Sequence, residues 1–256
     1  MARDPLRGPW LASRLAPARV RLFARLRSTN DYASRAVEDG TLAAPALVAA
    51  SLQTAGRGQH THTWWSDAGS LCITLVLPAD PALPVGQVPL RAGLAVAEAV
   101  AHHLPGQCVQ VKWPNDVFVD GRKIAGLLCL RRRDADLIGI GLNVTTDLRR
   151  APREIRDRAT SLAAHTRHPP RRDEVLCDLW RVLLALRTRT DWQEALTRRH
   201  LLANRTVVVT DCGSEAPARG IVRGVDEEGR LLLEVEGVIV AVTQGTPRII
   251  RDRLTG

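Results

Sequence analysis

Lysine, methionine and tyrosine are nearly absent from this chain. Of its 36 lysines and arginines only Lys112 and Lys123 are lysines, and it has one methionine and one tyrosine. No apolar run approaches the roughly 20 residues that a membrane-spanning helix needs, and the N-terminus lacks the unbroken apolar core of a secretory signal. The five cysteines are odd in number and include no C-x-x-C pair, which favours reduced thiols. We therefore expect a soluble, cytoplasmic protein without a membrane partner.

The composition is that of an ordinary globular protein with a basic surface. With 256 residues, 45% of them hydrophobic, the chain can bury one large domain, or a large and a small one. A net charge of +9 could attract nucleic acid, but the arginines are scattered through every region and form no basic stripe with interleaved aromatics. A non-enzymatic nucleic-acid binder stays open as an alternative, and it predicts tight, steeply salt-dependent binding.

The two lysines lie in one short segment, which also contains an unusual string of polar residues. Lys112-Trp-Pro-Asn-Asp116 combines the end of a strand, a rigid proline bend, an amide and a carboxylate, and has little purely structural motive. Asp120-Gly121 is a strong hairpin signal, so Lys123 should follow a tight turn. An ammonium is compact where a guanidinium is a planar fork, so a crowded anion site can require lysine. The segment predicts a ligand site, although Asp116 could simply pair with Lys112.

Two further motifs suit an anionic ligand. Gly56-Arg57-Gly58 places glycines on both sides of an arginine, which lets backbone amides approach a phosphate or carboxylate. Its spacing is not that of a Walker loop. Trp64 follows and offers a face on which a purine could stack, or else packs in the core. Ser28-Thr29-Asn30 precedes a helical stretch and is at least a helix cap.

The pattern of apolar residues predicts an α/β (α+β) fold of two parts. Helices are expected at residues 28–40, 89–104 and 173–202. Strands are expected before residue 204 at 20–26, 46–51, 71–77, 108–113, 117–119, 122–130 and 137–144, and after it at 207–210, 218–225, 231–235 and 238–242. We predict an N-terminal extension at 1–19, a larger domain at 20–203 and a small β-barrel at 204–256.

Taken together, these motifs resemble those of the biotin protein ligases, and they occur in the same order along the chain. The matching stretches are Ser28–Asn30, Gln53 with Gly56–Gly58, Trp64 with Ser66 and Gly69, Lys112–Asp116, Gly121–Gly126, Gly139–Asn143 and Ala159–Leu162. The resemblance implies a biotinyl/lipoyl ligase-like catalytic domain, with a mixed sheet and flanking helices, and a C-terminal SH3-like β-barrel. Because only 27 residues precede Ser28, it implies the monofunctional type without an N-terminal DNA-binding domain.

The activity implied by the resemblance is ATP-dependent attachment of biotin to a lysine of a biotin carboxyl carrier protein, through biotinyl-5′-adenylate. Biotin and ATP would be substrates with Mg²⁺ as a cofactor, and AMP and pyrophosphate would leave. The partner would be the carrier domain of a biotin-dependent carboxylase. No DNA binding is expected, and a homodimer is a possible assembly. A lipoate or octanoyl ligase of the same fold is the nearest alternative, and a degenerate, inactive ligase is another.

The same resemblance implies a role for each site residue. Lys123 and Arg57 would be catalytic, with Lys123 bridging the biotin carboxylate and the α-phosphate. The biotin-binding residues would be Ser28, Thr29, Asn30, Gln53, Arg57, Gly58, Gln59, Lys123 and Gly126. The residues that bind ATP or the adenylate would be Gly56, Trp64, Lys112, Asn115, Asp116 and Asn143, with Asp116 also near Mg²⁺. Segment 145–158 is charged, lacks clear periodicity and follows a predicted binding strand, so we expect it to be a mobile cover over the adenine.

The chain departs from the family at two positions of the glycine loop. Bacterial relatives usually carry arginines where this chain has Gln59 and His62, so two cations expected near the phosphates are missing. Gln59 can still donate an amide hydrogen bond, and His62 is charged only at lower pH. We therefore expect this chain to hold biotinyl-adenylate less tightly than relatives that carry both arginines.

Overall fold

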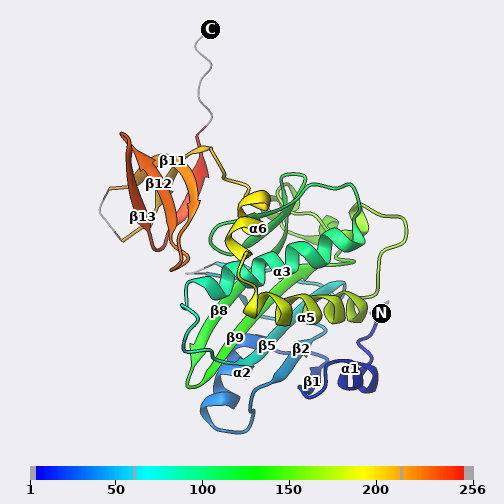
Figure 1. Ribbon diagram of the computed structural model, residues 1–256. Helices are drawn as coiled ribbons and strands as arrows, with labels where there is room; N and C mark the ends of the chain where they lie inside the picture. The colour runs from blue at the N-terminus through cyan, green and yellow to red at the C-terminus, as the bar shows by residue number, and fades with distance from the viewer. Residues whose placement is uncertain (1–3, 60–61, 214–215, 251–256) are drawn as a thin grey trace.

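A computed structural model describes residues 4–59, 62–213 and 216–250 (Figure 1). The histidine at position 60 and the last six residues of the predicted C-terminal domain therefore lie outside the described residues. The chain forms a seven-stranded sheet with helices on both faces, a separate five-stranded sheet and a two-stranded ribbon.

The large sheet has the strand order β1-β2-β5-β9-β8-β7-β6. β1 and β2 are parallel and the other neighbours are antiparallel, so the predicted mixed sheet is confirmed. Its centre is the long pairing of β5 with β9, from Ser70 opposite Asn143 to Pro78 opposite Ala135. The bounds are β1 Arg19–Phe23, β2 Ala46–Ala50, β5 Ser70–Pro78, β6 Val109–Lys112, β7 Asp116–Val119, β8 Arg122–Arg132 and β9 Ala135–Asn143.

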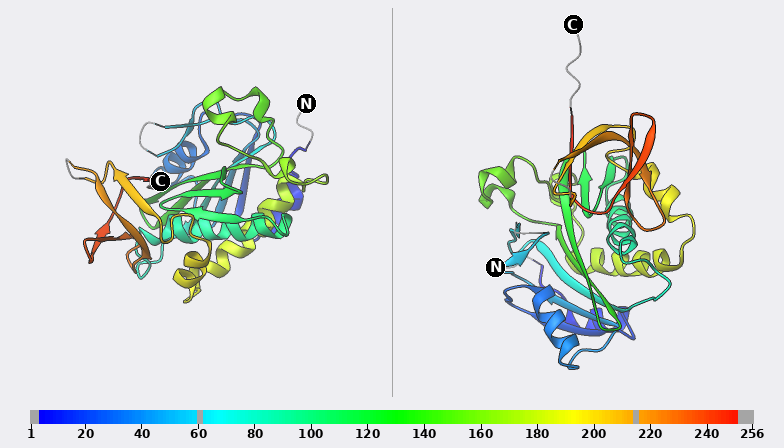
Figure 2. Two further views of the ribbon diagram at one scale, coloured as in Figure 1. Left: turned by 90° about the horizontal axis from the view of Figure 1, so that it is seen from above. Right: turned by 90° about the vertical axis from the view of Figure 1, so that its left-hand side faces the viewer.

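Helices cover the two faces of this sheet unequally. Because side chains alternate along a strand, Ile73 and Leu75 of β5 join a core shared with α3 and α5, whereas Val76 joins a smaller cluster with Ala33 and Val37 of α2. α3 and α5 lie side by side on the sheet, with α2 beyond it (Figures 1 and 2). The bounds are α2 Thr29–Glu38, α3 Gln87–His103, α5 Arg172–Thr188 and α6 Trp192–Arg199.

The single helix expected over residues 173–202 is wrong, because the structure has two helices, α5 and α6. A buried arginine of α3 ends the first one. Arg91 Nη1 donates to the carbonyl oxygens of Leu186 at 2.6 Å and Arg189 at 2.9 Å. The last carbonyls of a helix have no partner within it, and here a side chain from a distant segment supplies one. Arg189 is extended (φ −69°, ψ 125°) and α5 stops before it.

The C-terminal sheet has the order β13-β12-β11-β10-β14, with all neighbours antiparallel. Its four predicted strands are present. β14 was missed because proline cannot donate in a sheet and so weakens a strand pattern. Pro247 is tolerated since β14 is an edge strand that pairs only with β10. The bounds are β10 Thr206–Thr210, β11 Ala218–Val225, β12 Leu231–Val235, β13 Val238–Val242 and β14 Thr246–Ile249.

The N-terminal residues contain a helix that the sequence pattern did not indicate, α1 (Gly8–Arg14). Leu11 and Leu15 are fully buried in the main core. Just before the helix, Arg7 Nε donates to Asp173 Oδ2 at 2.6 Å, and the Asp173 side chain has no exposed surface. The extension is therefore part of the packed structure around α5.

Replacing the arginine of this pair should destabilise the protein in a pH-dependent way. Burial alone would raise the pKa of Asp173, but hydrogen bonds from Arg7 and Arg171 hold it below its ordinary value. A lowered carboxyl pKa stabilises the fold above the unfolded value, about 3.9, and this is lost as the pH falls. We expect Arg7→Met to lower Tm by a few degrees at pH 7 and by less near pH 3, in thermal unfolding monitored by circular dichroism. Arg25→Met, at an exposed site, is the control; an equal loss at both pH values would contradict the account.

Neither a membrane-spanning helix nor a metal-binding cluster is found among the described residues. Over the parts of the chain that are described, no helix is long and apolar enough to cross a membrane. The same residues include no cluster of three or more His, Cys, Asp or Glu suited to a metal ion.

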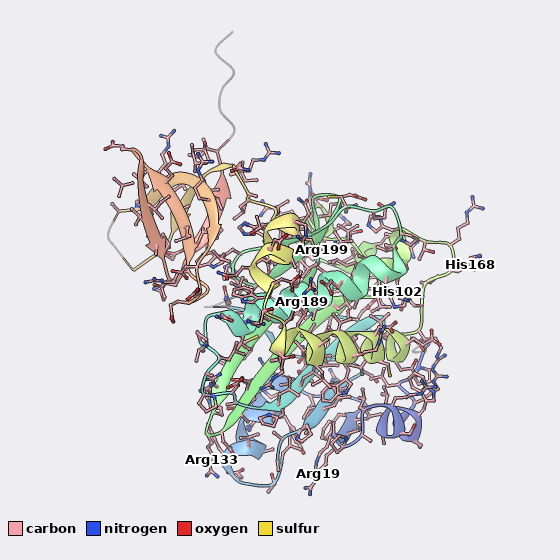
Figure 3. All side chains as sticks on the ribbon, viewed as in Figure 1. Arg19, His102, Arg133, His168, Arg189 and Arg199 are labelled. Carbon is pink, nitrogen blue, oxygen red and sulfur yellow. The ribbon has the colours of Figure 1, made fainter. Side chains whose placement is uncertain are left out.

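The labelled arginines of Figure 3 lie in different parts of the molecule. Arg19 and Arg133 lie at its lower edge in this view, whereas Arg189 and Arg199 lie near its centre.

Candidate active site

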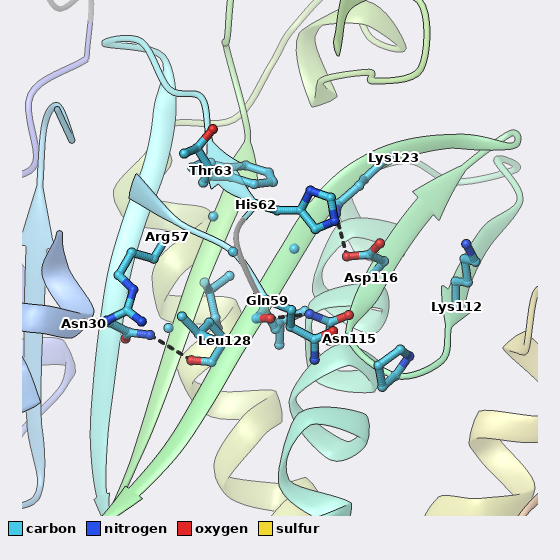
Figure 4. A pocket seen from close by; sticks show the side chains of 18 of the residues that line it. Asn30, Arg57, Gln59, His62, Thr63, Lys112, Asn115, Asp116, Lys123 and Leu128 are labelled. Atoms are coloured by element: carbon cyan, nitrogen blue, oxygen red, sulfur yellow. Dashed lines mark hydrogen bonds and ion pairs between the residues drawn. The ribbon is translucent and has the colours of Figure 1, made fainter. Parts of the chain in front are cut away.

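A cavity of about 280 Å³ opens on the α2 face of the large sheet (Figure 4). All of the predicted site residues line it except Gly56 and Asn143. Those that line it come from segments far apart in the sequence: Ser28, Thr29, Asn30, Gln53, Arg57, Gly58, Gln59, Trp64, Lys112, Asn115, Asp116, Lys123 and Gly126. In Figure 4, Asn30 and Arg57 lie at one end, Lys112 at the other, and Lys123 with Asp116 between them.

One end of the cavity is uncharged and rich in hydrogen-bonding groups. Ser28 is the N-cap of α2, as predicted, and its side chain accepts from Asp31 N at 3.3 Å. The backbone N–H and the hydroxyl of Thr29 both donate to Gln53 Oε1, at 2.8 and 3.1 Å. Asn30 Nδ2 donates to Leu128 O at 2.9 Å (Figure 4). The cap motif is therefore also one wall of a cavity, with its side chains held in fixed directions.

Two glycines of β9 make room for this wall. A Cβ placed on Gly139 would lie 2.4 Å from the amide of Asn30, and one on Gly141 would lie 2.3 Å from Trp64 Cε2. Cβ atoms do not approach heavy atoms so closely, so neither site accepts a side chain without displacing its neighbour. The sequence pattern identified this glycine-rich strand, but it did not show which side chains pack on it.

The glycine loop forms a short ribbon beside the cavity. β3 (Gly56–Arg57) pairs with β4 (Thr63–Trp64). A Cβ on Gly56 would meet Trp64 O at 2.6 Å, so Gly56 serves the ribbon rather than the cavity lining. Arg57 Nη1 lies 2.8 Å from Asp31 Oδ1, a partner that the sequence did not suggest. The guanidinium is held at the rim, with 57% of the side chain exposed.

Lys123 occupies the middle of the cavity. The turn before it has positive φ at Asp120 (48°) and Gly121 (76°), as the hairpin prediction required. Lys123 N donates to Arg158 O at 2.9 Å, and Lys123 Nζ lies 2.6 Å from Asp116 Oδ1 (Figure 4). The alternative in which Asp116 simply pairs with Lys112 is therefore wrong, because Asp116 pairs with Lys123. In the sheet, Asp116 of β7 lies opposite Gly126 of β8, three residues beyond Lys123.

Lys112 lies at the end of the cavity opposite to Asn30 and Arg57 (Figure 4). Burial lowers the pKa of its ammonium, an effect that the charge of Asp116 opposes. Within the described residues, no carboxylate forms an ion pair with it. Gly245 and the first two residues of β14, Thr246 and Pro247, also line the cavity. Such an ammonium, partly withdrawn from water, is suited to bind a phosphate oxygen.

The remaining predicted residues lie close to these groups. Gln59 and His62 both line the cavity, at the positions where arginines were expected. Asn115 Nδ2 donates to Leu127 O at 2.6 Å, which fixes the bend after Lys112. Asn143 is buried behind the cavity and donates to Thr160 O at 3.0 Å. Its proposed contact with a nucleotide stays a prediction.

Segment 145–158, predicted as a mobile cover, contains two short helical turns in the structure, η1 (Leu148–Arg150) and α4 (Arg153–Arg156). Both ends of the segment are tied down. Thr145 N donates to Gly69 O at 3.0 Å, and Thr160 N, just beyond the segment, donates to Lys123 O at 2.8 Å. The last residue of the segment contacts the central lysine of the cavity directly, because Arg158 O accepts from Lys123 N at 2.9 Å.

Comparison with known proteins identifies the family of the chain. The sequence model of the biotin/lipoate A/B protein ligase family matches residues 22–147. A biotin–[acetyl-CoA-carboxylase] ligase of Mycobacterium tuberculosis is 34% identical over 238 residues, which cover 88% of this chain and 86% of that protein. The chain belongs to the biotin protein ligase family.

Solved structures of this family share the whole fold. A biotin protein ligase from Aquifex aeolicus in complex with biotin and ATP superimposes with a TM-score of 0.78 at 26% identity, covering 91% of this chain and 99% of that one. A biotin protein ligase from Leishmania major in complex with biotinyl-5-AMP has a TM-score of 0.58 at 26% identity, covering 89% and 99%. The likeness extends over both sheets, and it does not favour the nucleic-acid-binding alternative.

Proposed function

We propose that the chain joins biotin to a lysine of a biotin carboxyl carrier protein domain, using ATP and passing through biotinyl-5′-adenylate. One observation carries the proposal. A single cavity places three features in one row: an uncharged hydrogen-bonding end, a central Lys123–Asp116 pair, and Lys112, with which no carboxylate of the described residues forms an ion pair (Figure 4). That order suits a ligand with a neutral polar ring, a carboxylate and then phosphates.

In the first step the biotin carboxylate would attack the α-phosphorus of ATP and release pyrophosphate. Both reactants are anions, so the enzyme must neutralise and align them. We assign Lys123 to the oxygens of the reacting carboxylate and α-phosphate, and Lys112 to the distal phosphates. Arg57 would leave Asp31 and turn from the rim toward the carboxylate.

In the second step the acceptor lysine amine would attack the acyl carbon of the adenylate. The C–N bond forms, the bond from the acyl carbon to the phosphate oxygen breaks, and AMP leaves with the electron pair of that oxygen. The amine must be neutral to attack, so its proton is lost to water or to a nearby base. Lys123 would stay beside the departing phosphate and stabilise its charge.

Asp116 fits the requirements of a magnesium ion brought in with ATP. Mg²⁺ is usually held by one or two carboxylates together with substrate phosphates. Among the described residues that line the cavity, Asp116 is the one with a carboxylate side chain. It lies between the two lysines (Figure 4). When bound, the ion would offset phosphate charge. Asp116 would then exchange part of its contact with Lys123 for the metal.

We also propose a division of the chain into domains and a cellular location for the protein. We assign residues 204–256 to an SH3-like domain, supported by a sheet that shares no strand with the large one. Residues 1–19 would be an extension of the catalytic unit at 20–203, supported by the burial of Leu11 and Leu15 in its core. A cytoplasmic location is supported by Cys72, Cys108, Cys129 and Cys177, which form no disulfide.

The reaction class is tested by ATP–pyrophosphate exchange. We expect exchange that depends on added biotin and is not supported by lipoate or octanoate, because the cavity ends in hydrogen-bonding groups rather than in an apolar tunnel. Exchange supported by lipoate or octanoate and not by biotin would assign the chain to the other ligases of this fold.

Gln59 offers a further test of the cavity. We expect Gln59→Arg to slow release of biotinyl-adenylate by roughly tenfold or more, since a hydrogen bond to a charged group replaces a neutral one. The release rate would be followed by chasing labelled adenylate with excess unlabelled biotin and ATP. Gln59→Leu, which removes the amide without adding charge, should not slow release. An unchanged rate in Gln59→Arg would show that this position does not contact the adenylate.

A further inference from the structure

Thr74 is a buried hydroxyl directly behind the uncharged end of the cavity. It lies in the middle of β5, a strand whose other residues from Leu71 to Leu77 are apolar, and none of its surface is exposed. It does not line the cavity. Its Oγ1 lies 2.7 Å from Asn30 Oδ1 and 2.9 Å from Thr29 Oγ1. The hydroxyl therefore contacts two cavity residues without reaching the ligand space.

Counting protons gives this small network a direction. Asn30 Nδ2 donates to Leu128 O, so Asn30 Oδ1 points to Thr74. An amide oxygen can only accept, and a hydroxyl has one proton, so the Thr74 proton is required by Asn30. Amide orientations are assigned from their partners, and here a backbone carbonyl on one side and the hydroxyl on the other leave one choice.

The second amide of the cavity also has a defined direction. With the Thr74 proton facing Asn30, the one proton of the Thr29 hydroxyl goes either to Thr74 Oγ1, at 2.9 Å, or to Gln53 Oε1, at 3.1 Å. Gln53 Oε1 already accepts from the backbone N–H of Thr29, at 2.8 Å. Its oxygen is thus occupied, and Nε2 is its remaining polar end. The cavity consequently presents amide N–H donors from Asn30 and Gln53, and oxygen lone pairs from Thr29.

We propose that Thr74 is a positioning residue that sets this hydrogen-bond polarity and thereby selects a cyclic urea over a ring of the same shape with reversed polarity. The inference rests on the proposed function, because it assigns the urea ring of biotin to this end. A urea offers one carbonyl acceptor flanked by N–H donors, which matches the donors and lone pairs of the wall. Without the hydroxyl, Asn30 Oδ1 is buried without this donor, and only the bond from Nδ2 to Leu128 O still orients the amide.

The experiment compares biotin with 2-iminobiotin, a cyclic guanidine that places an N–H donor where biotin has its carbonyl oxygen. Thr74→Val keeps the side-chain shape and removes the hydroxyl. Losing a buried hydrogen bond of this kind should weaken biotin binding by about ten- to a hundredfold in calorimetry. Iminobiotin should lose much less, so the ratio of the two dissociation constants falls. KM for biotin should rise, while KM for ATP should stay unchanged.

Controls separate polarity from packing. Thr74→Ser retains the hydroxyl and should restore most of the biotin preference. Val76→Ala empties a fully buried site on the same face of β5, and should lower Tm while leaving the ratio unchanged. Should Thr74→Val fail to fold, Thr74→Cys takes its place, because a thiol is a weak donor and predicts a smaller change in the same direction.

Each failure has a distinct signature. If wild-type protein binds biotin but Thr74→Val weakens both ligands equally or neither, the role of Thr74 is overturned and the proposed function stands. If wild-type protein binds neither biotin nor iminobiotin, in the presence or absence of ATP, both proposals fall.

Discussion

Lys123→Arg should lose about 10²- to 10³-fold in biotin adenylation although the charge at position 123 is kept. The surroundings of the ammonium explain why. Lys123 Nζ lies 2.6 Å from Asp116 Oδ1 and 5.9 Å from the centre of the Trp64 ring. A Cβ on Gly126 would be only 3.2 Å from Nζ. This space accepts a compact ammonium. A guanidinium is planar and larger, and its donors need acceptors that are spaced to match them.

The rate of biotin-dependent ATP–pyrophosphate exchange measures this loss. Arg122→Lys, the reverse exchange at the exposed neighbouring residue, is the matched control and should leave the rate near that of the wild type. Lys123→Ala should be at least as impaired as Lys123→Arg. Near-normal exchange in Lys123→Arg would mean that the position needs only charge, and the arginine-biased composition would then be the better account of both lysines.

Gly139→Ala should weaken biotin binding by about 100-fold, through a single added methyl group. The new Cβ would lie 2.4 Å from the Asn30 amide, so that side chain must leave its place between Leu128 O and Thr74. Displacing a binding group by an ångström commonly costs a factor of this size. Some loss of stability is expected as well, because the core is overpacked.

Calorimetric titration with biotin tests the glycine, and thermal unfolding shows whether the variant is folded. Gly8→Ala is the control, since its Cβ would make an ordinary 3.4 Å contact with Leu22 Cδ1. The control should bind biotin as the wild type does. Undiminished binding by a folded Gly139→Ala would show that Asn30 is not part of the biotin site.

Features fixed by neighbours in the sequence could be predicted. Ser28 is the N-cap of α2 as expected, because capping depends on a side chain and the three residues after it. Lys123 follows the tight turn that Asp120-Gly121 indicated, because positive φ is a property of those residue types. These local rules place most strands and helices, whereas the gathering of the site residues in one cavity was expected only from the resemblance to the family.

Features that depend on residues far apart in the sequence could not be predicted from it. Arg91 ends α5 from 95 residues away, and Asn30 donates to Leu128 across 98 residues. Nothing in the sequence distinguishes Thr74 from other residues of a buried strand, because its partners, Thr29 and Asn30, lie 44 or more residues away. The Arg57–Asp31 pair likewise joins segments whose spacing in the sequence carries no signal. Such contacts are set by strand order, which no local pattern encodes.

Transfer of biotin to a carrier domain tests the central claim most directly. Purified chain, biotin, MgATP and a biotin carboxyl carrier domain would be incubated together, and the carrier would be examined by intact mass and peptide mapping. We predict the gain of one biotinyl group on one carrier lysine, dependent on both biotin and ATP, and its absence with Lys123→Ala. A folded wild-type protein that leaves the carrier unmodified would contradict the account.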